Sequence, residues 1–153
     1  MIRIAGLLIL PALLLSSCLD PVDPPELNEW GGEIVPFDEV TDPDRQFTGD
    51  VAMLTTRGRT ETRVRLWDAT PGVWYGWVVR MGGCLESGEP IGDPEAFPPF
   101  RVESPGGGEA GVGQGFATLS GIARTDVNYA LELFSEGDED GSLLACGDLE
   151  LFE

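Results

Sequence analysis

The residues that could carry out chemistry are unevenly represented in this chain of 153 residues, which contains no histidine. Without an imidazole, the Ser-His-Asp and Cys-His arrangements of nucleophilic catalysis cannot form. Asp and Glu are abundant, at 27 residues, so the composition also allows a two-carboxylate hydrolase, although a solvated acidic surface is the simpler interpretation. We therefore expect no catalytic residues, no cofactor, and no copper or zinc held by imidazoles.

The first of three cysteines follows a segment that resembles a bacterial lipoprotein signal peptide. Arg3 precedes an apolar run over 4–15, and the run leads into Leu15-Ser16-Ser17-Cys18, which resembles the lipobox. This resemblance implies that residues 1–17 are removed and that Cys18 is lipidated, with palmitate among the acyl chains. Leu19 at the next position favours sorting to the outer membrane. An ordinary signal peptide with an incidental cysteine, or a short membrane anchor, are the alternatives.

The net charge of −18 restricts the partners of the protein. Such a charge repels nucleic acid and anionic lipid surfaces, so attachment to a membrane would depend on the N-terminal lipid. Residues 18–45 are rich in Pro, Asp and Glu and predict a disordered acidic tether. Trp30 and the segment 34–37 are exceptions that could dock against the domain or contact a partner. We expect no nucleic acid partner and an envelope protein partner whose identity the sequence does not show.

The other two cysteines, Cys84 and Cys146, form an even remainder if Cys18 carries lipid. In an exported protein such a remainder predicts one disulfide. The bridge would close a loop of roughly 60 residues and contribute about 4 kcal/mol in the chain-entropy model.

Residues 46–153 predict a single all-β domain, because apolar residues recur with a period of two and no amphipathic helix is evident. Residues 82–115 are rich in Gly and Pro and predict loop. Several short strands separated by turns favour a β-sandwich or a Greek-key barrel. The expected strands cover 47–53, 62–67, 73–81, 116–122, 129–134 and 143–151.

Motifs spread over this domain resemble small exported Cu/Zn superoxide dismutase-like domains, which are related in fold to CHRD domains. Members of that family carry a W-H-x-H-x-G-x-C segment, a loop ending in an aromatic-Pro-Pro and a C-terminal A-C-G-D-L. The matching residues here are Thr70-Pro71-Gly72, Trp77, Gly82, Cys84, 90–100 with Phe97-Pro98-Pro99, Tyr129-Ala130 and 145–149. The resemblance implies a Greek-key β-barrel and a disulfide between Cys84 and Cys146.

The metal ligands of that family are missing here. The two histidines of the W-H-x-H segment fall on Val78 and Arg80, and a later strand histidine falls on Phe134. Val and Phe have no lone pair to donate, and Arg stays protonated. Strand alternation places Trp77 and Val79 toward the core and Val78 and Arg80 on the outer face.

Three further features are candidate binding sites. Arg57, Arg59, Arg63 and Arg65 could balance acids on neighbouring strands or contact an anionic partner. Trp74 could stack on Arg80 or belong to a binding surface. The acidic segment 136–142 superficially resembles a calcium loop, but it lacks the required glycine and the bidentate glutamate, so an acidic turn is the simpler interpretation.

These observations predict a membrane-anchored, non-catalytic envelope lipoprotein whose metal-less, superoxide dismutase-like domain serves as a structural or binding module. The alternative is a residual enzyme, or a weak calcium-dependent surface built from carboxylates.

Overall fold

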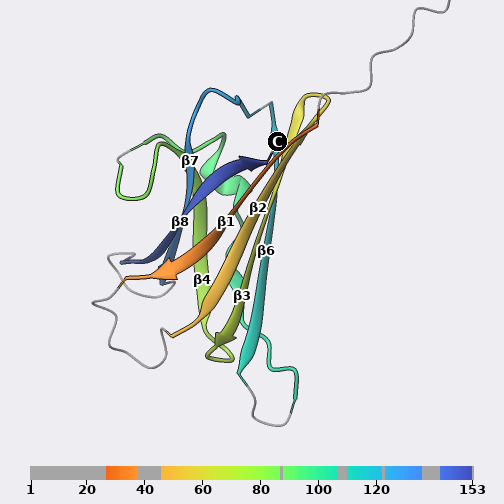
Figure 1. Ribbon diagram of the computed structural model, residues 1–153. Helices are drawn as coiled ribbons and strands as arrows, with labels where there is room; N and C mark the ends of the chain where they lie inside the picture. The colour runs from red at the N-terminus through yellow and green to blue at the C-terminus, as the bar shows by residue number, and fades with distance from the viewer. Residues whose placement is uncertain are drawn as a thin grey trace, which may run out of the picture.

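The fold consists almost entirely of antiparallel strands, as Figure 1 shows for the computed structural model. The structure describes residues 27–37, 46–86, 88–106, 110–121, 123–135 and 142–152. The expected signal peptide, the lipidation site Cys18 and all but the last residue of the acidic segment 136–142 lie outside these residues. Among the described residues no helix is long and apolar enough to cross a membrane.

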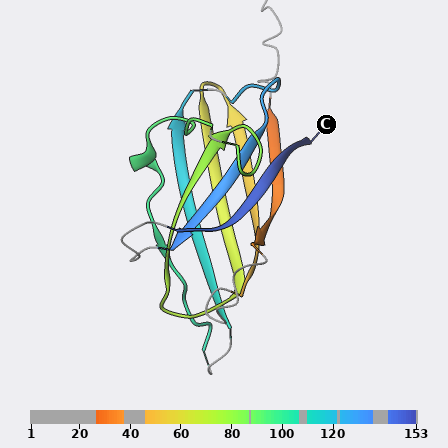
Figure 2. The same ribbon diagram turned by 90° about the vertical axis from the view of Figure 1, so that its left-hand side faces the viewer.

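Eight strands form one sheet in the order β5-β4-β7-β8-β1-β2-β3-β6. This sheet curves into a nearly closed barrel, because residues just after β5 return to β6 through a bridge between Glu103 and Val112 (Figure 2). The predicted all-β class is therefore confirmed. The strands are β1 (Asn28–Pro36), β2 (Thr48–Thr56), β3 (Arg59–Ala69), β4 (Trp74–Met81), β5 (Phe100–Arg101), β6 (Gly111–Ser120), β7 (Tyr129–Ser135) and β8 (Leu143–Phe152), and a 3-10 turn, η2, spans Pro94–Ala96.

The period of two along the strands produces an inner and an outer face. Inward residues of β2 and β3, such as Val51, Met53, Val64 and Leu66, are buried, while their neighbours along the chain are partly exposed. A two-residue turn at Arg57-Gly58 joins these strands, and both residues have positive φ. That conformation is typical of the type I′ hairpin turn, whose twist matches the strands.

Strand β1 corrects the predicted start of the domain. The acidic tether was expected to reach residue 45, but Asn28–Pro36 pairs with β2 on one side and with β8 on the other. Trp30 is 2% exposed and packs edge-on against Tyr129, with ring centroids 5.9 Å apart. The tether prediction is therefore wrong for 28–36, and this segment belongs to the domain.

The first part of β6 was predicted to be loop, up to residue 115, but it is a strand. Gly111, Gly113 and Gly115 lie on the inner face of a regular strand. A Cβ on Gly113 would lie 2.7 Å from the Phe100 ring, and one on Gly115 would lie 2.8 Å from Trp77 Nε1. These glycines therefore make room for the aromatic side chains that fill the barrel between β4 and β6.

Replacing Trp30 with Ala tests whether β1 is part of the folded domain. We expect Trp30→Ala to lower the free energy of unfolding by about 3–5 kcal/mol, the cost of removing a large buried aromatic side chain. Val35→Ala in the same strand is the control, because Val35 is 61% exposed and should change stability by less than about 0.5 kcal/mol. Urea denaturation measures both, and equal small effects would contradict the assignment of β1 to the core.

Candidate functional site

The positions expected to match metal ligands lie together on the outer face of β4 and β7. In the antiparallel register Val78 pairs with Glu132, and Gly76 pairs with Phe134. Because directly paired residues point to the same side of a sheet, Val78, Arg80, Glu132 and Phe134 share one face. The structure thus brings the three sequence-predicted positions together and adds Glu132 between them.

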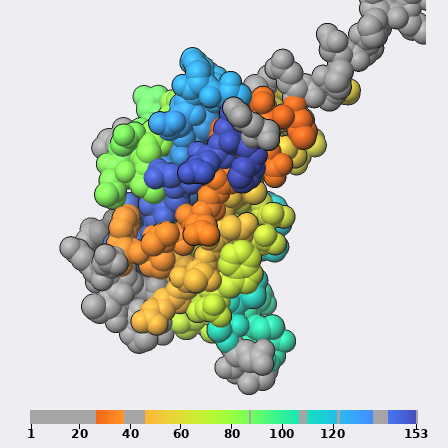
Figure 3. Space-filling view, in the orientation of Figure 1, coloured from red at the N-terminus to blue at the C-terminus, as the bar shows by residue number. Residues whose placement is uncertain are grey.

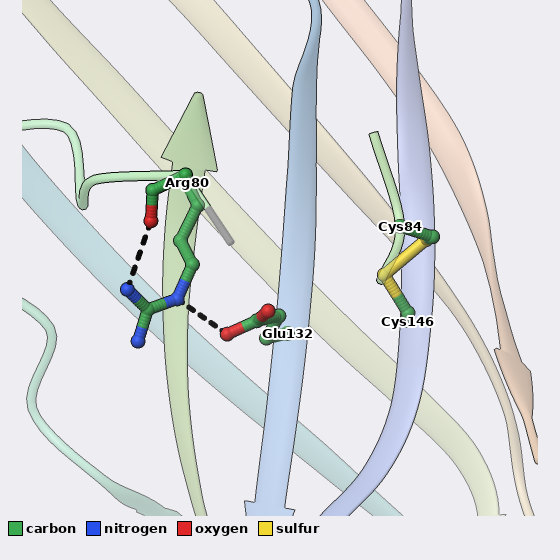
Figure 4. Close-up of polar contacts among 5 residues, drawn as sticks. Arg80, Cys84, Glu132 and Cys146 are labelled. Atoms are coloured by element: carbon green, nitrogen blue, oxygen red, sulfur yellow. Dashed lines mark hydrogen bonds and ion pairs between the residues drawn. A yellow bond between two sulfur atoms is a disulfide. The ribbon is translucent and has the colours of Figure 1, made fainter. Parts of the chain in front are cut away.

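Arg80 is held by two partners at this face. Its Nε donates to Glu132 Oε2 at 2.5 Å, and Nη1 donates to the carbonyl oxygen of Gly88 at 3.2 Å, as Figure 4 shows. The Arg80 side chain is 30% exposed and that of Glu132 is 14% exposed, so the pair is partly shielded from water. A guanidinium hydrogen-bonded to a carboxylate in this way is strong and directional.

The chemistry of these groups does not fit a copper or zinc centre. Glu132 is the only side chain among the four that can donate a lone pair, and it already accepts from Arg80. Within the described ranges no group of three or more His, Cys, Asp or Glu side chains could hold a metal ion. The arrangement is suited to holding a loop against the sheet.

That loop follows β4 and crosses the outer face. Gly82 turns the chain with φ 102°, and the Met81 amide donates to Glu89 O at 3.0 Å as the chain comes back alongside β4. The Ile91 amide then donates to Val79 O at 2.9 Å. Between Met81 and Glu89, Cys84 reaches β8 and bonds to Cys146.

A disulfide between Cys84 and Cys146 fixes the far side of this loop to β8, as predicted. The two Cα atoms lie 5.8 Å apart, within the usual range for disulfides. Beside it the Cys84 amide donates to Asp148 Oδ1 at 2.7 Å. Figure 4 shows this bridge and the Arg80–Glu132 pair on neighbouring strands of the same sheet.

The loop encloses part of this outer face and buries one of its residues. Val78 shares the face with Arg80 and Glu132, yet it is 7% exposed and belongs to the buried apolar cluster. Its row across the sheet contains Glu132 and Cys146, which are tied to Arg80 and to the loop. We attribute the burial of Val78 to these covering groups.

Sequence reasoning missed Glu132 because its role depends on strand register. The signal available was an arginine on a strand face that also carries apolar residues, since such a charge requires a counter-charge nearby. The residue directly across from Val78 could be identified only once the pairing of β4 with β7 was known.

Two of the four clustered arginines are balanced within the domain. Arg59 pairs with Glu61 at 2.7 Å, and Arg65 pairs with Asp50 at 3.1 Å. The hydrogen bond and the charge of Asp50 raise the pKa of Arg65 above its ordinary value. Arg65 also lies over the Trp67 ring, 5.2 Å from its centroid.

Arg57 and Arg63 do not follow this pattern. Arg57 occupies the hairpin turn, whereas Arg63 has a buried Nε without a hydrogen-bond partner among the described residues. Internal balance therefore explains Arg59 and Arg65 but not Arg63.

Trp74 does not stack on Arg80, so that prediction is wrong. The two residues lie six positions apart on the same strand, which separates them by roughly 20 Å. Trp74 pairs with Arg101 at the opposite end of β4 and stays exposed.

Removing the carboxylate of Glu132 tests the Arg80 contact. We expect Glu132→Gln to lower the free energy of unfolding by about 1–2 kcal/mol, because it leaves a partly buried guanidinium without its counter-charge. Asp126→Asn breaks the exposed pair between Arg124 and Asp126 and should have no measurable effect. Chemical denaturation of both variants provides the comparison, and an unchanged Glu132→Gln midpoint would contradict a structural role for the pair.

The disulfide should contribute more than the ion pair. Replacing both Cys84 and Cys146 with Ser should lower the free energy of unfolding by about 4 kcal/mol, the chain-entropy value for a loop of this length. Asp126→Asn, which changes an exposed side chain away from the bridge, is the control. Thermal unfolding of the parent and the variants measures the difference, and a double variant as stable as the parent would contradict this prediction.

Comparisons with protein-family models, with curated proteins and with solved structures find no match for this chain.

Proposed function

We propose that the protein is a lipid-anchored bacterial envelope lipoprotein whose superoxide dismutase-like β domain is non-catalytic and serves as a structural or binding module. The observation that carries this proposal is the Arg80–Glu132 pair on the outer face of β4 and β7. By the resemblance, the metal ligands would fall on Val78, Arg80 and Phe134, and an ion pair and a disulfide-tied loop lie at this part of the sheet.

The strand order supports the superoxide dismutase-like type. Strand β3 lies beside β6 instead of β4, and β4 pairs with β7 on the opposite side of the barrel. A chain that crosses the barrel in this way makes a Greek-key connection. The disulfide between Cys84 and Cys146 is the one that the resemblance implies.

The complete lack of histidine supports the absence of catalysis. A redox copper site requires ligands that this chain does not contain, and no serine or cysteine nucleophile has an imidazole to activate it. What persists is a rigid β scaffold with several outer surfaces, which suits binding or assembly.

Activity assays on the purified full chain test the non-catalytic proposal. We expect no superoxide dismutation after copper and zinc are supplied, and no heat of binding in calorimetry with millimolar calcium. Active dismutation would overturn the proposal, and saturable calcium binding would favour the acidic segment 136–142 as a binding site. An unrelated carrier protein at equal concentration controls for activity of metal that is not bound at a specific site.

Fractionation tests the proposed membrane attachment. The parent chain should sediment with the outer membrane and gain the mass of its acyl chains, whereas Cys18→Ala should lose both properties. Val35→Ala is the matched control, because it changes an exposed side chain of the domain without touching the lipidation site or the disulfide. A Cys18→Ala chain that stays in the membrane with an unchanged acyl mass would contradict lipid anchoring.

A further inference from the structure

A second outer face, formed by β8, β1, β2, β3 and β6, has a shallow groove on the outside of the barrel. Figure 3 shows β8, β1, β2 and β3 side by side at this surface, in blue, orange, yellow and yellow-green. The groove has a volume of about 320 Å³. Its outward-facing lining residues include Glu29, Ala52, Leu54, Glu61, Arg63 and Phe116.

The groove lies between two exposed aromatic rings. Phe116 on β6 is 58% exposed, and Phe152 on β8 is 57% exposed. The Phe152 ring lies against Gly31, where a Cβ would approach it to 2.7 Å, so the glycine makes room for the ring. Exposed phenylalanines on both sides of a groove are typical of an interaction surface.

Arg63 lines this groove and lacks a hydrogen-bond partner for its Nε among the described residues. Its Nε is buried and donates no hydrogen bond to the described part of the chain, in contrast to Arg59 and Arg65, which pair with acids. Leaving a buried donor unpaired costs free energy, and a partner carboxylate would recover that cost. The occupant of the groove should therefore carry a carboxylate beside an apolar group.

The same face carries such a carboxylate. The strand registers place Phe152, Glu29, Leu54 and Glu61 in one row across the sheet. The next row contains Gly31, Ala52, Arg63 and Phe116. Glu29 is exposed and forms no ion pair within the described ranges, whereas Glu61 is already paired with Arg59.

These two rows make the face self-complementary. In the first row an aromatic ring on β8 neighbours an acid on β1, and in the second row a base on β3 neighbours an aromatic ring on β6. Consider a two-fold axis that lies in the plane of the face and passes between Glu29 and Arg63. Rotation about this axis generates a second copy whose Glu29 and Arg63 positions are exchanged relative to those of the first. It places each Arg63 opposite Glu29 of a second copy and brings Phe152 toward Phe116.

We propose that this face is the interface of a homodimer, in which Arg63 of each copy pairs with Glu29 of the other between facing phenylalanines. A second copy supplies both the carboxylate and the apolar surface that the groove requires. The face differs from the outer surface of β4 and β7, so the proposal does not depend on the lost metal site or on lipid attachment.

Sedimentation equilibrium of the purified full chain in density-matched detergent tests the dimer. We expect a reversible monomer–dimer equilibrium. Arg63→Glu and Glu29→Arg should each raise the dissociation constant by about tenfold or more, because each places like charges opposite one another. Arg124→Glu makes the same change of charge at an exposed site outside the groove and should leave association unchanged.

Combining the two exchanges separates the proposed pairing from a general loss of structure. The doubly exchanged chain, Arg63→Glu with Glu29→Arg, should regain a dissociation constant within about threefold of the parent value, since opposite charges again face each other. Circular dichroism confirms that each variant is folded, and Glu29→Arg changes an exposed side chain that the fold does not need. A parent chain that stays monomeric to millimolar concentration, or a doubly exchanged chain that associates no better than the single variants, would overturn the proposal.

Discussion

The disulfide between Cys84 and Cys146 is the constraint on which the outer face of β4 and β7 depends. It ties the loop after β4 to β8 and so closes the chain over the intervening strand β7. The Gly88 carbonyl and the Glu132 carboxylate can then hold Arg80 from two sides. A covalent tie is well suited to this position, because the loop itself is rich in glycine and has little apolar surface to bury.

Two outer faces of one barrel therefore have different characters. On β4 and β7 the charged groups satisfy each other, and the loop shields them from water. On β1, β2, β3 and β6 the groove is open, two phenylalanines are exposed, and the Arg63 Nε lacks a partner among the described residues. The first face is internally complete, whereas the second has the polar and apolar groups that a partner would cover.

Local sequence patterns predicted most strands because alternation survives in a half-buried sheet. Strands β2, β3, β4, β7 and β8 all lie where the period of two indicated them. Strand β1 was missed because Gly31 and Gly32 interrupt its apolar pattern and acidic, Pro-rich segments flank it. The first half of β6 was missed because its inward positions are glycines. Glycine is needed there because the rings of Trp77 and Phe100, which come from distant parts of the chain, pack against these positions.

The candidate site was predictable only in part for a similar reason. Counting cysteines was sufficient to predict the disulfide, and the motif around Trp77 was sufficient to locate Val78 and Arg80. The partner Glu132 and the burial of Val78 depend on register and on the path of the loop, which are long-range properties. The predicted stacking of Trp74 on Arg80 failed because two residues on the same side of a strand can still lie far apart.

We propose that the Arg80–Glu132 ion pair, beneath the disulfide-tied loop, stands where similar domains would hold a metal. Elemental analysis of the full chain, purified after expression with added copper and zinc, tests it most directly. We expect far less than one equivalent of either metal per chain. One tightly held equivalent of copper or zinc would contradict it.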